Sequence, residues 1–138
     1  MLPVISASLS STNGLGTPTV LVVEDEPLIR LFVTEVLQDG GCHVLEAGTV
    51  AQAKRCLANT KVDLVFSDVN MPGGEDGFAL EKWVRRNYPD MKMLLTSGGA
   101  HAAEATRNLR EPMLPKPYSC ETFVRRIQDI LHSKVTAG

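Results

Sequence analysis

The chain of 138 residues has few cysteines and aromatic residues, no excess of basic residues and no long apolar run. Its three cysteines are odd in number and lack CxxC spacing, which argues against a disulfide framework and a zinc site. The formal net charge of -2, with both signs interspersed, provides no basic face for nucleic acid. No stretch approaches the roughly 18 to 20 apolar residues of a membrane span. These absences favour a soluble domain in a reducing compartment that contacts neither nucleic acid nor membrane.

The length fits one domain with its own apolar core, which we expect to cover residues 18–134. Residues 1–17 are rich in Ser and Thr and lack a basic segment, so we interpret them as a flexible tail rather than a signal sequence. Residues 135–138 are expected to form a short C-terminal tail.

Hydrophobic periodicity predicts five repeats of a strand followed by a helix. The third strand is almost continuously apolar, as parallel strands buried on both faces are. The last strand belongs at a sheet edge, because the prolines on either side donate no ladder hydrogen bond. Right-handed crossovers between such repeats give an α/β doubly wound parallel sheet with helices on both faces. The expected strands are residues 20–23, 43–47, 62–67, 91–95 and 113–114, and the expected helices are 27–39, 50–57, 78–86, 100–108 and 120–131.

Three aromatic residues, Phe32, Trp83 and Phe123, occupy apolar positions of predicted helices. Their periodicity indicates core positions rather than a platform for stacked bases.

Acidic residues stand at the carboxyl ends of two predicted strands. Glu24 and Asp25 follow the first strand, and Asp68 follows the third. Ligands gather at this edge in open α/β sheets, and a few water-accessible carboxylates suit Mg2+. A phosphoryl group would be favoured beside the metal, and Asp68 is the candidate nucleophile because a carboxylate can form an acyl phosphate. Thr96 and Lys116, after the fourth and fifth strands, can donate hydrogen bonds to the new phosphoryl oxygens.

Four short segments contain these candidates: Val23-Glu24-Asp25-Glu26-Pro27, Ser67-Asp68-Val69-Asn70-Met71-Pro72, Leu95-Thr96-Ser97-Gly98 and Leu114-Pro115-Lys116-Pro117. In this order they resemble the receiver domain of bacterial two-component response regulators. Each segment alone is weak evidence for the family, but the four segments in this order are a specific signature. The resemblance covers about residues 18–134. It implies a flavodoxin-like five-stranded sheet of order 2-1-3-4-5, an order taken from receiver domains and not read from this sequence.

The resemblance also implies the roles of individual residues. Asp68 would be the phosphoacceptor. Asp25 would bind Mg2+ directly, Glu24 through water and Asn70 through its backbone carbonyl. Thr96 and Lys116 would hold the phosphoryl group, and the peptide bond between Lys116 and Pro117 would be cis.

The implied protein is a stand-alone receiver, or one excised from a larger regulator or hybrid kinase, in the cytoplasm. Its phosphoryl donor would be a sensor histidine kinase or a phosphotransfer protein. It would signal to an unknown downstream protein through a shift of the last strand and its flanking helices. Such a domain is an autocatalytic phosphoacceptor with self-dephosphorylation rather than a turnover enzyme.

Three features depart from the usual receiver pattern. Met113 stands where receivers usually carry an aromatic residue, three positions before the lysine. Lys116 follows Thr96 by only 20 positions, which indicates a reduced or irregular fourth helix. The loop Met71–Gly77 is one residue longer between Met-Pro and Asp-Gly than the commonest pattern.

Alternative functions remain open. The absent aromatic residue favours a receiver-like interaction module that acts without phosphorylation, whereas the full set of acids, threonine and lysine argues against it. A magnesium-dependent aspartyl-phosphate phosphohydrolase typically carries its nucleophile in a D-x-D loop after the first strand, but Asp25 lies between Glu24 and Glu26. A flavin or nucleotide binder would offer backbone amides of Ser, Thr and Gly to phosphate at this loop, not three carboxylates.

Overall fold

The computed structural model describes residues 16–98 and 109–133. Three sequence-based predictions therefore lie outside the described residues: almost all of the tail 1–17, the helix 100–108 and the tail 135–138.

Five parallel strands form one sheet in the order β2-β1-β3-β4-β5, which confirms the order implied by the receiver resemblance. β1 and β3 are apolar and almost entirely buried, as expected for central parallel strands. β5 lies at the edge, as its flanking prolines predict. The strands are β1 (Thr19–Val23), β2 (His43–Ala47), β3 (Leu64–Asp68), β4 (Lys92–Ser97) and β5 (Leu114–Pro115).

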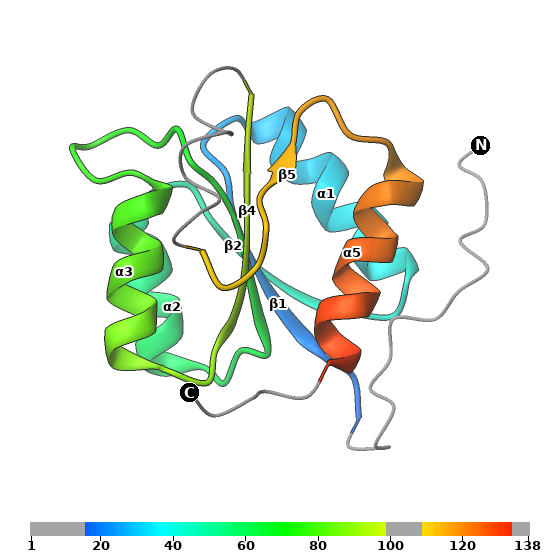
Figure 1. Cartoon of the computed structure of the whole chain (residues 1–138), viewed down its shortest axis with the longest axis horizontal. Coiled ribbons are helices and arrows are strands. Elements are labelled where there is room, and N and C mark those ends of the chain that lie inside the picture. Colours follow the sequence, from blue (N-terminus) through cyan, green and yellow to red (C-terminus); the bar gives the residue numbers. More distant parts are fainter. Residues whose placement is uncertain (1–15, 99–108, 134–138) are drawn as a thin grey trace.

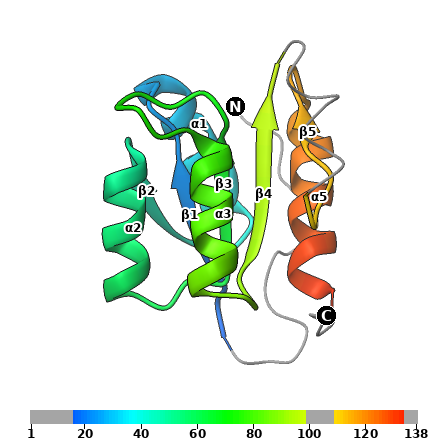
Figure 2. The same cartoon turned by 60° about the vertical axis from the view of Figure 1, so that its left-hand side comes forward.

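Two helices cover each face of the sheet within the described residues, which confirms the doubly wound architecture. Figure 1 shows α1 and α5 side by side on one face, and Figure 2 shows α2 and α3 together on the other. The helices are α1 (Pro27–Asp39), α2 (Val50–Asn59), α3 (Gly77–Asn87) and α5 (Cys120–His132).

The helix starts follow local sequence signals. Pro27 occupies the first turn of α1, where a missing N–H costs nothing. The side chains of Thr49, Asp76 and Ser119 each accept a hydrogen bond from a backbone N–H of the helix that follows. Asp76 thereby fixes the start of α3 at the end of the loop that leaves Asp68.

The prediction that Phe32 is a core residue is wrong, because 43% of its surface is exposed. Val33, Val36 and Leu37 fill the face of α1 that packs on the sheet. Phe32 lies about 100° around the helix axis from Val33 and therefore points partly to solvent.

The other two aromatic predictions fare differently. Phe123 is buried in the core beneath α1 and α5, as predicted. Trp83 is only half-buried at the edge of the opposite core, with the Lys54 ammonium 5.3 Å from its ring centre.

Candidate metal and phosphoacceptor site

Asp68 is the last residue of β3 and is held in place by neighbouring strands. It lies in register with Thr96 of β4, and the N–H of the next residue, Val69, donates to the Thr96 carbonyl at 2.9 Å. The Asn70 N–H donates to the Asp68 Oδ1 atom at 3.1 Å. The side chain is almost fully buried, so its carboxylate has a defined direction. The parallel register thus places the Asp68 carboxylate at the carboxyl edge of the sheet.

Three carboxylates converge at this edge. Glu24, Asp25 and Asp68 each offer an oxygen, and these atoms lie within 4.8 Å of one another. Glu24 is buried and accepts a hydrogen bond from the Glu26 N–H at 3.0 Å, whereas Asp25 is exposed. Oxygen donors that are few and partly open to water suit Mg2+, which keeps several waters of its own. We call Glu24, Asp25 and Asp68 the acid cluster.

The ionisation of Glu24 is perturbed by its position at this edge. Burial raises the pKa of Glu24 from 4.5 to about 7, and the negative charge of Asp68 adds to this rise. The hydrogen bond from Glu26 and the positive charge of Lys116 act in the opposite direction. A divalent cation among these carboxylates would relieve their repulsion, so the donor set fits the expected metal.

Lys116 reaches the cluster from the edge of the sheet. Its ammonium lies 2.9 Å from the Asp68 Oδ2 atom, and its backbone N–H donates to the Ser97 carbonyl at 3.0 Å. The Lys116–Pro117 peptide is cis, as the receiver resemblance implies. The lysine therefore touches the candidate nucleophile directly.

Thr96 lies beside Asp68, but its hydroxyl is directed elsewhere. The Oγ1 atom donates to the Leu114 carbonyl of β5 at 2.7 Å, and both residues are buried. The hydroxyl is thus engaged with the edge strand and not with the acceptor carboxylate.

Met113 precedes β5 and is buried in a small apolar cluster with Val69 and Leu95. These two partners are the chain neighbours of Asp68 and Thr96. Met113 therefore packs among side chains from the segments next to Asp68 and Thr96, although it belongs to neither β3 nor β4.

Sequence reasoning missed two residues that position this edge. A Cβ atom at Gly77 would lie 2.7 Å from the Val69 Cα and closer still to the Asp68 carbonyl, so only glycine lets α3 begin against the end of β3. The Arg30 Nη1 atom donates to the Glu24 carbonyl at 2.7 Å. The Asp-Gly pair at the start of α3 could have indicated the special position of Gly77. Nothing in the sequence distinguishes Arg30 from other arginines on surface helices.

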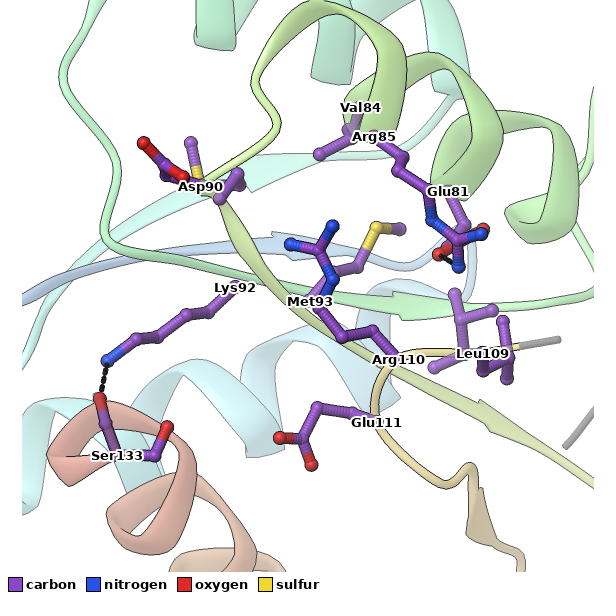
Figure 3. A pocket seen from close by; sticks show the side chains of 12 residues that line it. Glu81, Val84, Arg85, Asp90, Lys92, Met93, Leu109, Arg110, Glu111 and Ser133 are labelled. Atoms are coloured by element: carbon purple, nitrogen blue, oxygen red, sulfur yellow. Dashed lines mark hydrogen bonds and ion pairs between the residues drawn. The ribbon is translucent and has the colours of Figure 1, made fainter. Parts of the chain in front are cut away.

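A cavity of about 210 Å³ lies between α3, the start of β4 and the segment 109–111. Figure 3 shows Lys92 at its border, with its ammonium on Ser133 at the end of α5. None of the predicted site residues lines this cavity. The acid cluster is therefore a separate feature of the molecule.

Across the described ranges, every helix is too short or too polar to span a lipid bilayer.

Comparison with known proteins gives a consistent result. A family model for the response regulator receiver domain matches residues 20–128. The chain is 35% identical over 130 residues to the sensor kinase CckA of Brucella abortus and 36% identical over 108 residues to the response regulator protein FleR of Pseudomonas aeruginosa. These alignments cover 90% and 76% of the chain, but only 14% of CckA and 23% of FleR.

Solved structures show the same fold. The chemotaxis response regulator CheY4 of Vibrio cholerae is similar with a TM-score of 0.73 and 29% identity, over 83% of this chain and 98% of that one. The non-phosphorylated HemR receiver domain of Leptospira biflexa has a TM-score of 0.77 and 23% identity, over 88% of this chain and 100% of that domain. With the acid cluster, Lys116 and the strand order already in place, these matches lead to one conclusion: the chain belongs to the response regulator receiver domain family.

Proposed function

We propose that Asp68 accepts a phosphoryl group from the phosphohistidine of a sensor histidine kinase or a phosphotransfer protein, with Mg2+ bound at the acid cluster. The observation that carries this proposal is the convergence of three carboxylates within 4.8 Å, with Lys116 bonded to Asp68. Receiver domains are generally phosphoacceptors rather than turnover enzymes. Slow self-dephosphorylation and a cytoplasmic location are parts of the same proposal.

The transfer is a displacement at phosphorus. One carboxylate oxygen of Asp68 forms the new P–O bond as the P–N bond to the donor imidazole breaks, and the electron pair of that bond stays on the imidazole nitrogen. The product is an acyl phosphate on Asp68. Because the carboxylate is buried and fixed by the bond from the Asn70 N–H, little orientation is lost when it attacks.

Mg2+ would neutralise the cluster and the incoming phosphoryl oxygens. Asp25 and Asp68 would hold it directly, Glu24 through a water molecule, and Asn70 through its backbone carbonyl. Lys116 would then exchange its bond to the carboxylate for a bond to a phosphoryl oxygen.

Thr96 would convert the covalent change into movement. In this structure its hydroxyl donates to the Leu114 carbonyl, 18 positions away in the chain. A phosphoryl oxygen on Asp68 is a stronger acceptor, because it is charged. When the hydroxyl turns to it, the buried Leu114 carbonyl loses its partner, and β5 and the helices beside it must adjust.

The donor protein has to cover the start of α1 to reach a buried aspartate. This helix begins two residues after Asp25, and its first turns carry exposed apolar side chains: 77% of the surface of Leu28, 51% of Leu31 and 43% of Phe32 are exposed. Burying such side chains against a partner is favourable. We therefore place the donor contact on this face of α1, next to the acid cluster.

The direct test uses a small-molecule phosphodonor. The wild-type chain, incubated with Mg2+ and acetyl phosphate, should gain the mass of one phosphoryl group, and chelation of Mg2+ should prevent the gain. Asp68→Asn should gain none. An unmodified wild-type chain under these conditions would favour the interaction module that acts without phosphorylation.

A second experiment separates the donor contact from the chemistry. Leu31→Asp should slow labelling by a phosphorylated histidine kinase but leave labelling by acetyl phosphate unchanged. Ala58→Asp, on exposed surface of α2, is the matched control and should behave as wild type. Equal slowing with both donors would show that Leu31 acts on the site and not on the donor contact.

A further inference from the structure

Arg30 links the helix that follows the acid cluster to the neighbouring strand. It lies in the first turns of α1, where its Nη1 atom donates to the Glu24 carbonyl at 2.7 Å. Its Nε atom donates to Glu46 of β2 at 3.3 Å. The side chain is mostly buried, with 24% of its surface exposed. One guanidinium thus contacts both the acid loop and β2.

These bonds close a ring around Glu24. The Glu24 N–H donates to the Ala47 carbonyl at 2.9 Å, and Ala47 directly follows Glu46 in β2. Both polar backbone atoms of Glu24 are therefore tied to the same strand, the N–H directly and the carbonyl through Arg30. Linked hydrogen bonds of this kind restrain the groups they join.

The Glu24 carbonyl belongs to the peptide that connects Glu24 to Asp25. Because a peptide unit is planar, fixing the direction of its carbonyl also fixes the adjacent backbone dihedrals of both residues. An independent change of ψ at Glu24 or of φ at Asp25 would move the Asp25 side chain relative to Glu24. The bond from Arg30 therefore restrains two members of the acid cluster at one point.

The segment after β2 leaves room for this guanidinium. A Cβ atom at Gly48 would lie 3.3 Å from the Arg30 Nη1 atom and 3.4 Å from the Gln52 Oε1 atom, which accepts a hydrogen bond from the Gly48 N–H at 2.7 Å. Glycine thus avoids pressing on the arginine.

A lysine cannot reproduce this arrangement. The planar guanidinium donates in two directions from one rigid group, whereas an ammonium at the end of a flexible chain is a single point charge. The hydrogen bonds of Arg30 go to the Glu24 backbone carbonyl and to the Glu46 side chain, not to a carboxylate of the cluster. Its effect on the cluster is therefore one of geometry more than of charge.

We infer that Arg30 is a positioning residue of the acid cluster, which holds the peptide between Glu24 and Asp25 so that their carboxylates face Asp68. This inference rests on the proposed Mg2+ site and extends it to a residue that contacts no metal. Residues that orient metal ligands typically change metal affinity by about 10- to 100-fold when replaced.

The test compares Mg2+ affinity, measured by calorimetry, in four variants of the full chain. Arg30→Met should bind Mg2+ about tenfold more weakly than wild type. The Mg2+ affinity of Arg30→Lys should lie between those of Arg30→Met and wild type. Glu46→Gln weakens only the bond that holds the Arg30 guanidinium on β2, so it should lose less affinity than Arg30→Met. Arg55→Met is the control, because it removes the same charge from an exposed position of α2.

A second measurement, of amide NMR signals, uses the metal-free protein and tests the backbone position directly. The amide signals of Asp25 and Glu26 should shift or broaden in Arg30→Met, while those of β3 residues stay in place. Thermal melting identifies any variant that is not folded at the measuring temperature. If Arg30→Met does not fold, Glu46→Gln replaces it in the test, and wild-type Mg2+ affinity in that variant would overturn the role of Arg30.

Two failures are distinguishable. Wild-type Mg2+ affinity in folded Arg30→Met, or a loss no larger than in Arg55→Met, would overturn the role of Arg30 alone. Absence of Mg2+ binding in the wild-type chain would overturn the metal site and the inference together.

Discussion

The two sides of the site differ in how far they are assembled. On the acceptor side, formed by Glu24 and Asp25 after β1 and by Asp68 at the end of β3, the carboxylates already converge within 4.8 Å. On the response side, formed by Thr96 and Met113 near β4 and β5, the threonine hydroxyl is bonded to the Leu114 carbonyl. Lys116 joins the two sides through its contact with Asp68.

This difference suggests that phosphoryl transfer and the conformational response depend on different residues. Under the proposed function the acceptor side would need only a metal and a donor, because Glu24 and Asp68 are already held by hydrogen bonds from backbone N–H groups. The response side has to break an existing buried bond, and leaving a buried acceptor unpaired costs about 1–3 kcal/mol. Variants on the acceptor side should therefore abolish Mg2+ binding or phosphoryl transfer. Variants on the response side should change the size of the conformational response.

The largest effect is expected for Asp25→Ala on the acceptor side. Asp25 is the exposed carboxylate of the cluster and the one best placed to meet an incoming ion. Its removal should abolish Mg2+ binding, seen as loss of the calorimetric heat and of any Mg2+-dependent change in Trp83 fluorescence. Glu35→Ala, an exposed acid on α1, is the control. Equal Mg2+ affinity in Asp25→Ala and wild type would remove the basis for the metal site.

Lys116→Ala should separate the two sides. Under the proposed function the lysine would stabilise the phosphorylated product more than the attack, so the variant should still accept a phosphoryl group from acetyl phosphate but show a much weaker conformational response. Mass spectrometry measures the first property and amide chemical shifts measure the second. Lys61→Ala, at an exposed position, should leave both unchanged. Complete loss of labelling in Lys116→Ala would contradict this division of roles.

A smaller effect concerns pH and the stability of the metal-free protein. Glu24 takes up a proton at about pH 7 when folded and at about 4.5 when unfolded. Between these values the folded state binds more protons, so its stability falls as pH rises through this window, by an amount on the order of 3 kcal/mol.

Denaturant unfolding in the presence of a chelator, at several pH values from 4.5 to 7.5, measures this slope. Glu24→Gln carries no titrating group at this position and should show a flatter profile. A wild-type profile as flat as that of Glu24→Gln would mean that the buried carboxyl does not retain its proton.

The fold could be predicted from the sequence where one signal dominates. Continuous apolar runs identified β1 and β3. Pro27 in the first turn gave the start of α1, and the N-cap Ser119 gave the start of α5. Strand order came from the receiver resemblance, because periodicity identifies strands but not their neighbours. Phe32 was misplaced because α1 has more than one apolar stripe, and only the packed sheet selects the one that is buried.

The convergence of the acid cluster and Lys116 could also be predicted, because the carboxyl ends of parallel strands share one edge. The direction of the Thr96 hydroxyl could not, because it depends on which acceptor lies nearer in the folded chain. The close approach of α3 that requires Gly77, and the ring of bonds through Arg30, likewise arise only from tertiary contacts.

The smallest expected effect is on the response side, at Met113. Receivers usually carry an aromatic residue here, which changes rotamer when the threonine turns to the phosphoryl group. Methionine is unbranched and adaptable, so it can fill either space without a strong preference. Its contacts with Val69 and Leu95 still connect it to the segments around Asp68 and Thr96.

If the two arrangements differ little in energy, phosphorylation shifts their populations only in part. Met113→Tyr should then enlarge the response, and phosphorylation-dependent binding of the downstream partner should strengthen with it. Amide chemical shifts of wild type and Met113→Tyr, with and without the phosphoryl mimic beryllofluoride, compare the two responses. Met113→Leu serves as a non-aromatic control of similar volume. A wild-type response as large and as two-state as that of Met113→Tyr would show that the residue at this position does not set the coupling, and that the exchange of the Thr96 hydroxyl between Leu114 and the phosphoryl group is sufficient.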